Sequence, residues 1–130
     1  MPAEGTDRTV LIVDDDPDVC RFVVMVLTGQ GYRTIGSRTG REALSSLRGD
    51  IDVLVTDLSL PDIDGVTLIE RVKAGCPDAG VVLMSGYAEV PRARLERLGI
   101  KWTFLPKPFP IQKLVEAVRR VATHAGARAA

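Results

Sequence analysis

Four short apolar runs in this 130-residue sequence each lead into residues that can take part in phosphate chemistry. They are 10–13 before Asp14 and Asp15, 53–56 before Asp57, 81–84 before Ser85, and 104–106 before Lys107. If these runs are parallel strands of one sheet, the residues meet at its carboxyl edge, where open α/β sheets place their sites. Three carboxylates, a hydroxyl and an ammonium would together form a site for a divalent cation and a phosphoryl group.

Each residue type has a defined task in such a site. Carboxylates about 4 Å apart repel one another by roughly 1 to 4 kcal/mol, and a hard cation such as Mg²⁺ relieves that repulsion. One carboxylate can instead act as a nucleophile and take the phosphoryl group as an acyl phosphate. Lys107 would offset the charge of the transferred group, and Ser85 would donate a hydrogen bond to one of its oxygens.

Each motif also has a plainer explanation. Residues 14–16 could be a solvated loop with a helix cap, and residues 107–110 could be a structural turn. In the segment 60–65, we expect Asp62 and Asp64 to cap the helix that follows rather than to bind a metal. Taken singly these signals are weak, but their occurrence at four strand ends favours the phosphate site.

The elements that position these residues follow a regular alternation of short apolar runs with amphipathic segments. Uninterrupted apolar runs are typical of strands buried on both faces, as in parallel sheets. Successive strand–helix units predict one parallel sheet with helices on both faces, because each crossover is right-handed. We expect strands at 10–13, 32–37, 53–56, 81–84 and 102–105, the second of them at a sheet edge.

Several helix boundaries carry their own signals. Asp16 followed by Pro17 predicts an N-cap and a first helical residue, and Gly29 and Gly31 predict the end of that helix. The segment 39–42 resembles a capping box. The helix expected over about 90–98 has the thinnest apolar stripe, whereas the closing helix has a clear 3.6-residue period.

Composition limits the possible functions. Seventeen basic residues balance seventeen acidic ones, so overall charge favours neither nucleic acid nor an anionic membrane as a partner. Cys20 and Cys76 lack metal or redox spacing, and we expect both to be buried thiols. No apolar stretch approaches the roughly 20 residues of a membrane span, and no secretory signal is recognisable, so we expect a cytoplasmic protein. We expect one domain over 9–124, with flexible ends at 1–8 and 125–130.

Four segments give the sequence a specific resemblance to the receiver domains of response regulators, the phospho-accepting modules of two-component signalling. The segments are 10–17 (VLIVDDDP), 52–65 (DVLVTDLSLPDIDG), 84–88 (MSGYA) and 107–109 (KPF). The resemblance covers about residues 9–124. It implies a CheY-like, flavodoxin-like α/β fold, with a doubly wound five-stranded parallel sheet in the order 2-1-3-4-5.

The resemblance also implies a role for each carboxylate. Asp57 would be the phosphoacceptor, in a phosphorelay that forms an aspartyl phosphate. Mg²⁺ would be held by Asp15, Asp57 and the backbone carbonyl of Ser59, with Asp14 acting through a bound water.

Three further residues would form the switch. Lys107 would contact the phosphoryl group, Ser85 would be the switch hydroxyl, and Phe104, where tyrosine is frequent, would be the aromatic switch residue. A cis peptide bond is implied before Pro108.

The same resemblance implies the partners. The phosphoryl donor would be a histidine kinase or a histidine phosphotransfer protein. An effector, or a second copy of the chain, would bind through the fourth helix, fifth strand and fifth helix. We expect no direct contact with nucleic acid and no membrane insertion.

Two other functions would use parts of the same sequence pattern. A small Mg²⁺-dependent phosphohydrolase with a nucleophilic aspartate would also use these residues, although Ser59 stands where such enzymes carry a second aspartate. A receiver-like scaffold that works unphosphorylated would not need the acidic set. We therefore expect a signalling module that catalyses its own phosphorylation and dephosphorylation, rather than an enzyme.

Overall fold

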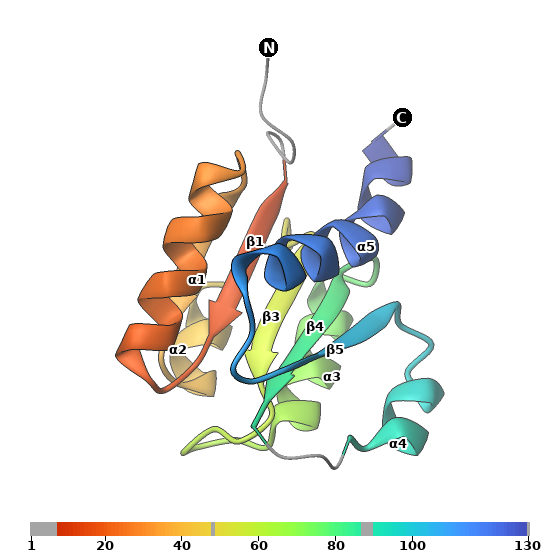
Figure 1. Cartoon of the computed structure of the whole chain (residues 1–130). Coiled ribbons are helices and arrows are strands. Elements are labelled where there is room, and N and C mark those ends of the chain that lie inside the picture. Colours follow the sequence, from red (N-terminus) through yellow and green to blue (C-terminus); the bar gives the residue numbers. More distant parts are fainter. Residues whose placement is uncertain (1–7, 48, 87–89, 130) are drawn as a thin grey trace.

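Along the described residues, five strands alternate with five helices (Figure 1). The computed structural model describes residues 8–47, 49–86 and 90–129, with side chains placed as far as residue 122. The strands are β1 (Thr9–Val13), β2 (Arg33–Ser37), β3 (Val53–Asp57), β4 (Gly80–Ser85) and β5 (Trp102–Pro106). The helices are α1 (Pro17–Gly29), α2 (Gly40–Ser45), α3 (Gly65–Gly75), α4 (Arg92–Arg97) and α5 (Ile111–Ala129).

All five strands are parallel and form one sheet in the order β2-β1-β3-β4-β5. This confirms the predicted fold class and strand order. Every residue of β1, β3 and β4 is buried, as their uninterrupted apolar character requires. β2 and β5 form the two edges and are more exposed, which confirms the edge position predicted for the second strand.

The helices cover both faces of the sheet, so the protein has two apolar cores (Figure 1). On one face, α1 and α5 pack on alternate strand residues such as Ile12, Val55 and Met84. On the other face, the intervening residues, such as Leu11 and Leu83, contact α2, α3 and α4. Strand side chains alternate between the faces, so each central strand contributes to both cores.

The boundaries of α1 and α3 follow their sequence signals. Asp16 caps α1 by accepting hydrogen bonds from two N–H groups of its first turn. Gly31, just beyond the end of α1, has a φ of 95°, a conformation that favours glycine. α3 ends at Gly75, and Asp64 is its N-cap, as expected.

The helix α2 departs from the expected capping box in one of its two bonds. Thr39 Oγ1 accepts from the Glu42 N–H at 3.1 Å, as predicted. Glu42, however, accepts from the Arg38 N–H at 3.3 Å instead of returning to Thr39. Arg38 directly follows the edge strand β2, which has no neighbouring strand on its outer side among the described residues, and the Glu42 carboxylate supplies an acceptor there.

Two other boundaries differ from expectation. α4 is shorter than the predicted 90–98, because Pro91 at its start offers no side-chain cap and Leu95 alone of its residues is buried. α5 continues to Ala129, past the expected boundary at 124.

At the N-terminus, the Arg8 carbonyl accepts a hydrogen bond from the Arg33 N–H. The rest of the expected flexible N-terminus lies outside the described residues. Among the described helices, none combines the length and apolar character needed to cross a membrane.

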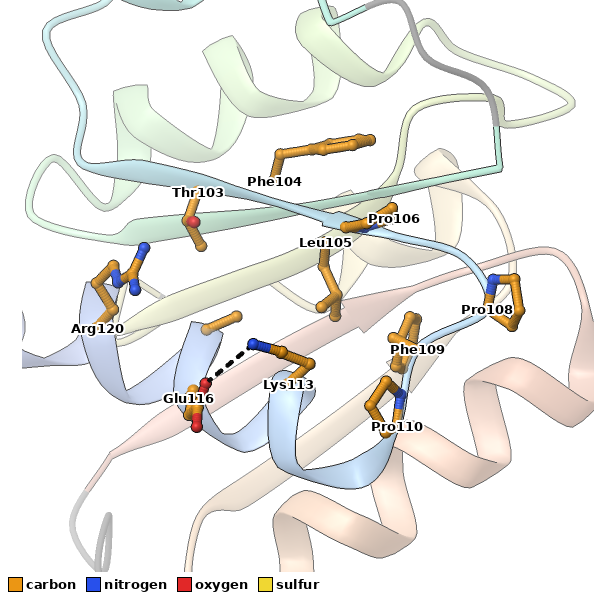
Figure 2. A pocket seen from close by; sticks show the side chains of 11 residues that line it. Thr103, Phe104, Leu105, Pro106, Pro108, Phe109, Pro110, Lys113, Glu116 and Arg120 are labelled. Carbon is orange, nitrogen blue, oxygen red and sulfur yellow. Dashed lines mark ion pairs between the residues drawn. The ribbon is translucent and has the colours of Figure 1, made fainter.

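A groove of about 370 Å³ lies between the edge strand β5 and α5 (Figure 2). Phe104 and Leu105 point to opposite sides of β5, so each contacts a different core. Lys113 and Arg120 of α5 line the groove, and Lys113 Nζ lies 3.9 Å from a Glu116 carboxylate oxygen. This surface therefore combines apolar side chains with exposed positive charge.

Candidate functional site

The strand register brings the predicted site residues to one edge of the sheet. Val13 of β1 is paired with Thr56 of β3, so Asp14 and Asp57, the next residues along the two strands, lie at the same level of the sheet. Asp57 is in turn paired with Met84, which precedes Ser85. Ser85 is paired with Pro106, which precedes Lys107, and the Lys107 N–H donates to the Ser85 carbonyl at 2.8 Å. The carboxyl ends of four strands thus place all these groups side by side.

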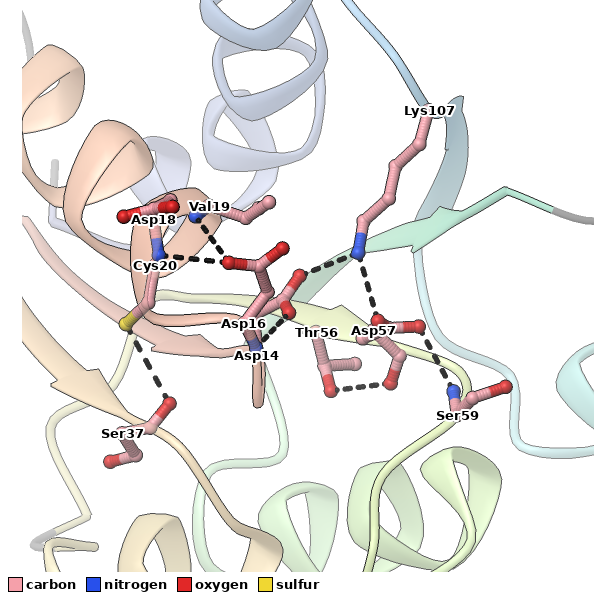
Figure 3. Close-up of polar contacts among 10 residues, drawn as sticks. All are labelled: Asp14, Asp16, Asp18, Val19, Cys20, Ser37, Thr56, Asp57, Ser59 and Lys107. Carbon is pink, nitrogen blue, oxygen red and sulfur yellow. Dashed lines mark hydrogen bonds and ion pairs between the residues drawn. The ribbon is translucent and has the colours of Figure 1, made fainter.

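The Lys107 ammonium joins two of the carboxylates (Figure 3). Its Nζ lies 2.7 Å from Asp14 Oδ2 and 2.9 Å from Asp57 Oδ2. The Asp14 side chain is fully buried and that of Asp57 is 12% exposed, so neither carboxylate is well solvated. The Lys107 ammonium supplies the positive charge that compensates for the lost hydration. The predicted convergence of Lys107 with Asp14 and Asp57 is therefore confirmed.

The loop after β3 holds the other oxygen of Asp57. The Ser59 N–H donates to Asp57 Oδ1 at 3.0 Å, and the Leu58 N–H donates to the Met84 carbonyl at 3.1 Å. Both oxygens of Asp57 are thus engaged by donors on two different segments (Figure 3). This arrangement fixes the plane of the carboxylate.

Burial and charge shift two pKa values at the site. Burial raises the pKa of Asp14 above its usual value, although hydrogen bonds from Lys107 and from the Asp16 N–H oppose the shift. Burial alone would lower the pKa of Lys107, but its hydrogen bonds and charge attraction to Asp14 and Asp57 outweigh burial and raise it. The ammonium is therefore held in its charged form.

The acidic residues offer a set of ligands for a hard cation. One oxygen each from Asp14, Asp15 and Asp57 lies within 4.8 Å of the other two. Asp15 is exposed, so the cluster is open to solvent on one side. Three carboxylates face a single ammonium, and oxygen ligands with surplus negative charge are what Mg²⁺ prefers. The residues present therefore fit Mg²⁺.

The two residues expected to form the switch, Ser85 and Phe104, occupy neighbouring strands. Ser85 is 5% exposed and ends β4, one position past the residue paired with Asp57. Phe104 is half-buried in β5, is paired with Leu83, and packs on the core beneath α3 and α4. Ser85 is paired with Pro106 of β5, and Phe104 precedes Pro106 by two residues. The peptide bond between Lys107 and Pro108 is cis, as the resemblance implies.

One expectation about the loop after β3 is wrong. Asp64 caps the following helix by accepting from the Thr67 N–H at 3.3 Å, but Asp62 does not. The Asp62 carboxylate instead accepts from Gly40 and Arg41 N–H groups, at the start of α2. Sequence reasoning missed this contact because it joins segments 21 and 22 residues apart.

The cysteines take no part in the acidic site. Both are free and buried, which confirms the expectation. Cys20 Sγ donates to the Ser37 carbonyl at 3.7 Å, and burial together with the nearby Asp14 charge raises the pKa of its thiol. A protonated, enclosed thiol is a packing group.

Comparison with known proteins assigns the fold to a widespread signalling family. Residues 10–119 match the family described as response regulator receiver domain. The chain is 36% identical over 116 residues to the sensor kinase CckA of Brucella abortus, covering 87% of this chain and 12% of that protein. It is 32% identical over 114 residues to the DNA-binding transcriptional regulator NtrC of Klebsiella pneumoniae, covering 87% of this chain and 24% of that protein.

A solved structure agrees with this assignment. A CheY-like response regulator receiver domain protein from Methanospirillum hungatei superposes with a TM-score of 0.81 at 23% identity, over 92% of this chain and 98% of that one. The likeness supports the CheY-like fold. The chain itself spans about an eighth and about a quarter of the two curated relatives.

Proposed function

The chain belongs to the family of response regulator receiver domains, and from this premise we propose that it accepts a phosphoryl group on Asp57 and switches conformation to control a partner. The observation that carries the proposal is the Lys107 ammonium, bound to both Asp14 and Asp57 at the carboxyl edge of the sheet. An ammonium already beside the acceptor carboxylate can neutralise the charge that phosphorylation adds.

The residues of the site divide the transfer among them. An Asp57 carboxylate oxygen attacks the phosphorus of the donor, so an O–P bond forms as the P–N bond to the donor histidine breaks. Lys107 holds and orients Asp57 beforehand and attracts the phosphoryl oxygens during the transfer. The Ser59 N–H fixes the plane of the attacking carboxylate.

Mg²⁺ is the cofactor we propose for this site. Asp15, Asp57 and the Ser59 carbonyl would hold it, with Asp14 acting through a water. When bound, Mg²⁺ neutralises phosphoryl oxygens and the surplus charge of the carboxylates. The exposed position of Asp15 leaves a route for the cation from solvent.

The response to phosphorylation would begin at Ser85. Its hydroxyl would donate to a phosphoryl oxygen, which draws the end of β4 toward Asp57. Phe104, half-buried on the adjacent strand, would then turn inward and change the surface formed by α4, β5 and α5. An effector or a second copy of the chain would recognise that surface, which includes the groove of Figure 2.

The donor would be a histidine kinase or a histidine phosphotransfer protein. An apolar hollow of about 470 Å³ lies directly beside Lys107 and is lined by Val19 and Phe22 of α1 together with Phe109. The rings of Phe22 and Phe109 are 6.3 Å apart, and Met25 is 65% exposed on the same helix. An apolar patch next to the acceptor suits a helical donor that must bring its phosphohistidine to Asp57.

We class the protein as a signalling module that catalyses its own phosphorylation and dephosphorylation, and place it in the cytoplasm, where ATP-dependent kinases supply phosphoryl groups.

Incubation with Mg²⁺ and acetyl phosphate should add one acid-labile phosphoryl group, measured by intact-protein mass. The Asp57→Asn variant should gain none. An unmodified wild type, an undiminished gain in Asp57→Asn, or sustained turnover of phosphomonoesters would contradict the proposal.

A further inference from the structure

The loop between β3 and α3 contacts the acceptor carboxylate directly. Residues 58–64 form a tight reversal, closed by an antiparallel bridge between Ser59 and Asp64 and by a 3.3 Å hydrogen bond from the Gly65 N–H to the Leu58 carbonyl. Within this loop the Ser59 N–H donates to Asp57 Oδ1 at 3.0 Å. Any change in the path of the loop therefore reaches the carboxylate.

The tip of the same loop is bound to a different element, the helix α2. Asp62 Oδ1 accepts from the Gly40 N–H at 2.9 Å, and Oδ2 accepts from the Arg41 N–H at 2.8 Å. Both oxygens of one carboxylate thus bind two consecutive backbone amides, a strong and directional arrangement. Next to this contact, Gly40 packs so closely on Ile63 that a Cβ at position 40 would overlap the Ile63 side chain.

The anchor itself is firmly placed. Gly40 and Ala43 of α2 are buried, and Ala43 belongs to the core on that face of the sheet. Thr39 caps the same helix through the Glu42 N–H, so α2 keeps an N-terminal cap of its own without Asp62. The Asp62 contact is thus additional to the capping of α2, and its distinctive effect is to fasten the loop.

We propose that Asp62 is a positioning residue for phosphorylation: by fastening the β3–α3 loop to α2, it holds the Ser59 backbone where it orients the Asp57 carboxylate. The inference rests on the proposed function, because it assigns a task within that reaction. A rival explanation is that Asp62 only stabilises α2. The two explanations differ in whether removal of the Asp62 carboxylate displaces the Ser59 backbone.

The chain offers a matched pair of variants to separate them. Asp62→Ala removes a cap of α2 together with the tie to the loop, whereas Thr39→Ala removes a cap of the same helix and leaves the tie in place. We expect Asp62→Ala to lower the maximal rate of phosphorylation by acetyl phosphate and Mg²⁺ about 10-fold, because small misplacements of a reacting group cost rate steeply. Thr39→Ala should stay within about two-fold of the wild type, and Asp62→Asn, which keeps one acceptor oxygen, should fall between them.

A second measurement needs no phosphoryl transfer. In the unphosphorylated protein, the Ser59 amide signal in ¹H–¹⁵N NMR should shift and its hydrogen exchange should quicken in Asp62→Ala and, less so, in Asp62→Asn. In Thr39→Ala both should match the wild type. Thermal unfolding identifies a temperature at which all variants are folded for these measurements.

The outcomes are decisive in either direction. Equal slowing by Asp62→Ala and Thr39→Ala, or a Ser59 amide that ignores Asp62→Ala, would overturn the positioning role. If the wild type accepts no phosphoryl group, the proposed function fails, and the Ser59 amide still decides whether Asp62 positions the loop.

Discussion

At the scale of single residues, Lys107 is the group on which the site depends most. Its ammonium is the charge partner of two carboxylates, and its side chain is only 21% exposed. We expect Lys107→Met to slow phosphorylation by acetyl phosphate by about 10²-fold or more, since removing one charge-stabilising donor has that effect in enzymes. We also expect tighter Mg²⁺ binding, because cation and ammonium compete for the same carboxylates.

The control for this substitution is Lys113→Met. Lys113 is exposed on α5, and its Nζ lies 3.9 Å from Glu116 Oε1. It is not bonded to the site carboxylates Asp14 and Asp57, which pair with Lys107. Acetyl phosphate labelling followed by mass spectrometry measures the rate, and calorimetry measures Mg²⁺ affinity. Equal rates in both lysine variants would show that the ammonium does not assist the transfer.

Asp62 provides a second test at this scale, through pH. Hydrogen bonds from the Arg41 and Gly40 N–H groups lower the pKa of Asp62 below its usual value. A carboxylate whose pKa is lower in the folded state stabilises the fold fully above its unfolded pKa of about 3.9, and loses that contribution as pH falls through the folded pKa. The free energy of unfolding of Asp62→Asn should therefore lie below that of the wild type at pH 7, with the gap closing below about pH 4.

Urea unfolding at a series of pH values measures this gap. Thr39→Ala removes no titratable group, so its deficit in unfolding free energy should stay constant over the same range. If the difference in unfolding free energy between Asp62→Asn and the wild type were equally constant, the negative charge of Asp62 would make no contribution to stability.

The residues at the site differ in how far sequence could predict them. Asp14, Asp57, Ser85 and Lys107 each stand at the end of an apolar strand, and parallel register alone brings such positions together. The partner of Asp62 had no such signal. An aspartate shortly before a helix normally caps that helix, and nothing local shows that the loop folds back on a segment 22 residues earlier.

At the scale of elements, α1 carries an exposed apolar patch that the fold alone does not require. Met25 is 65% exposed, and Phe22 lines the hollow that also contains Lys107. We expect Met25→Glu to slow phosphoryl transfer from a phosphorylated histidine phosphotransfer protein about 10-fold, because a charge at an apolar contact costs on the order of 1 to 3 kcal/mol. Transfer from acetyl phosphate, which needs no docking surface, should be unchanged.

Radiolabel transfer with both donors distinguishes the two steps. Arg33→Glu, an exposed change on the edge strand β2, is a control for added negative charge elsewhere on the surface. Slower labelling of Met25→Glu by acetyl phosphate would point to damage at Asp57 rather than to lost docking.

Element boundaries were predictable where a residue acts on its own chain neighbours. Asp16 marks the start of α1 through hydrogen bonds to its first turn, and Gly31 marks the end of that helix through its positive φ. The limits of α4 were less predictable, because its six residues bury one leucine and its start lacks a side-chain cap. α4 also makes two contacts with other elements: Arg94 Nη2 lies 3.3 Å from Asp64 Oδ2, and the Arg92 guanidinium carbon lies 5.4 Å from the centre of the Trp102 ring.

At the scale of the whole molecule, a net charge of zero conceals a strong asymmetry. Nine of the seventeen basic residues, but two of the seventeen acidic ones, follow position 90. The described part of that segment forms α4, β5 and α5, whereas the carboxylates of the site follow β1 and β3. The α4–β5–α5 segment therefore carries an excess of positive charge, although Lys107 of the same segment reaches the carboxylates of the site.

The acidic cluster predicts a link between global stability and Mg²⁺. The folded protein concentrates Asp14, Asp15 and Asp57 within a few ångströms, and the unfolded chain does not, so a cation that binds the cluster favours the folded state.

At a Mg²⁺ concentration ten times the dissociation constant, the free energy of unfolding should rise by about 1.4 kcal/mol, and the melting temperature by about 5 °C. Asp15→Asn should lose most of this gain, whereas Asp18→Asn, an exposed change in the first turn of α1, should keep it. Thermal melts at constant ionic strength, with excess EDTA as the metal-free reference, measure the shift; an equal gain in Asp15→Asn would mean that Mg²⁺ acts by general screening and not at the acidic cluster.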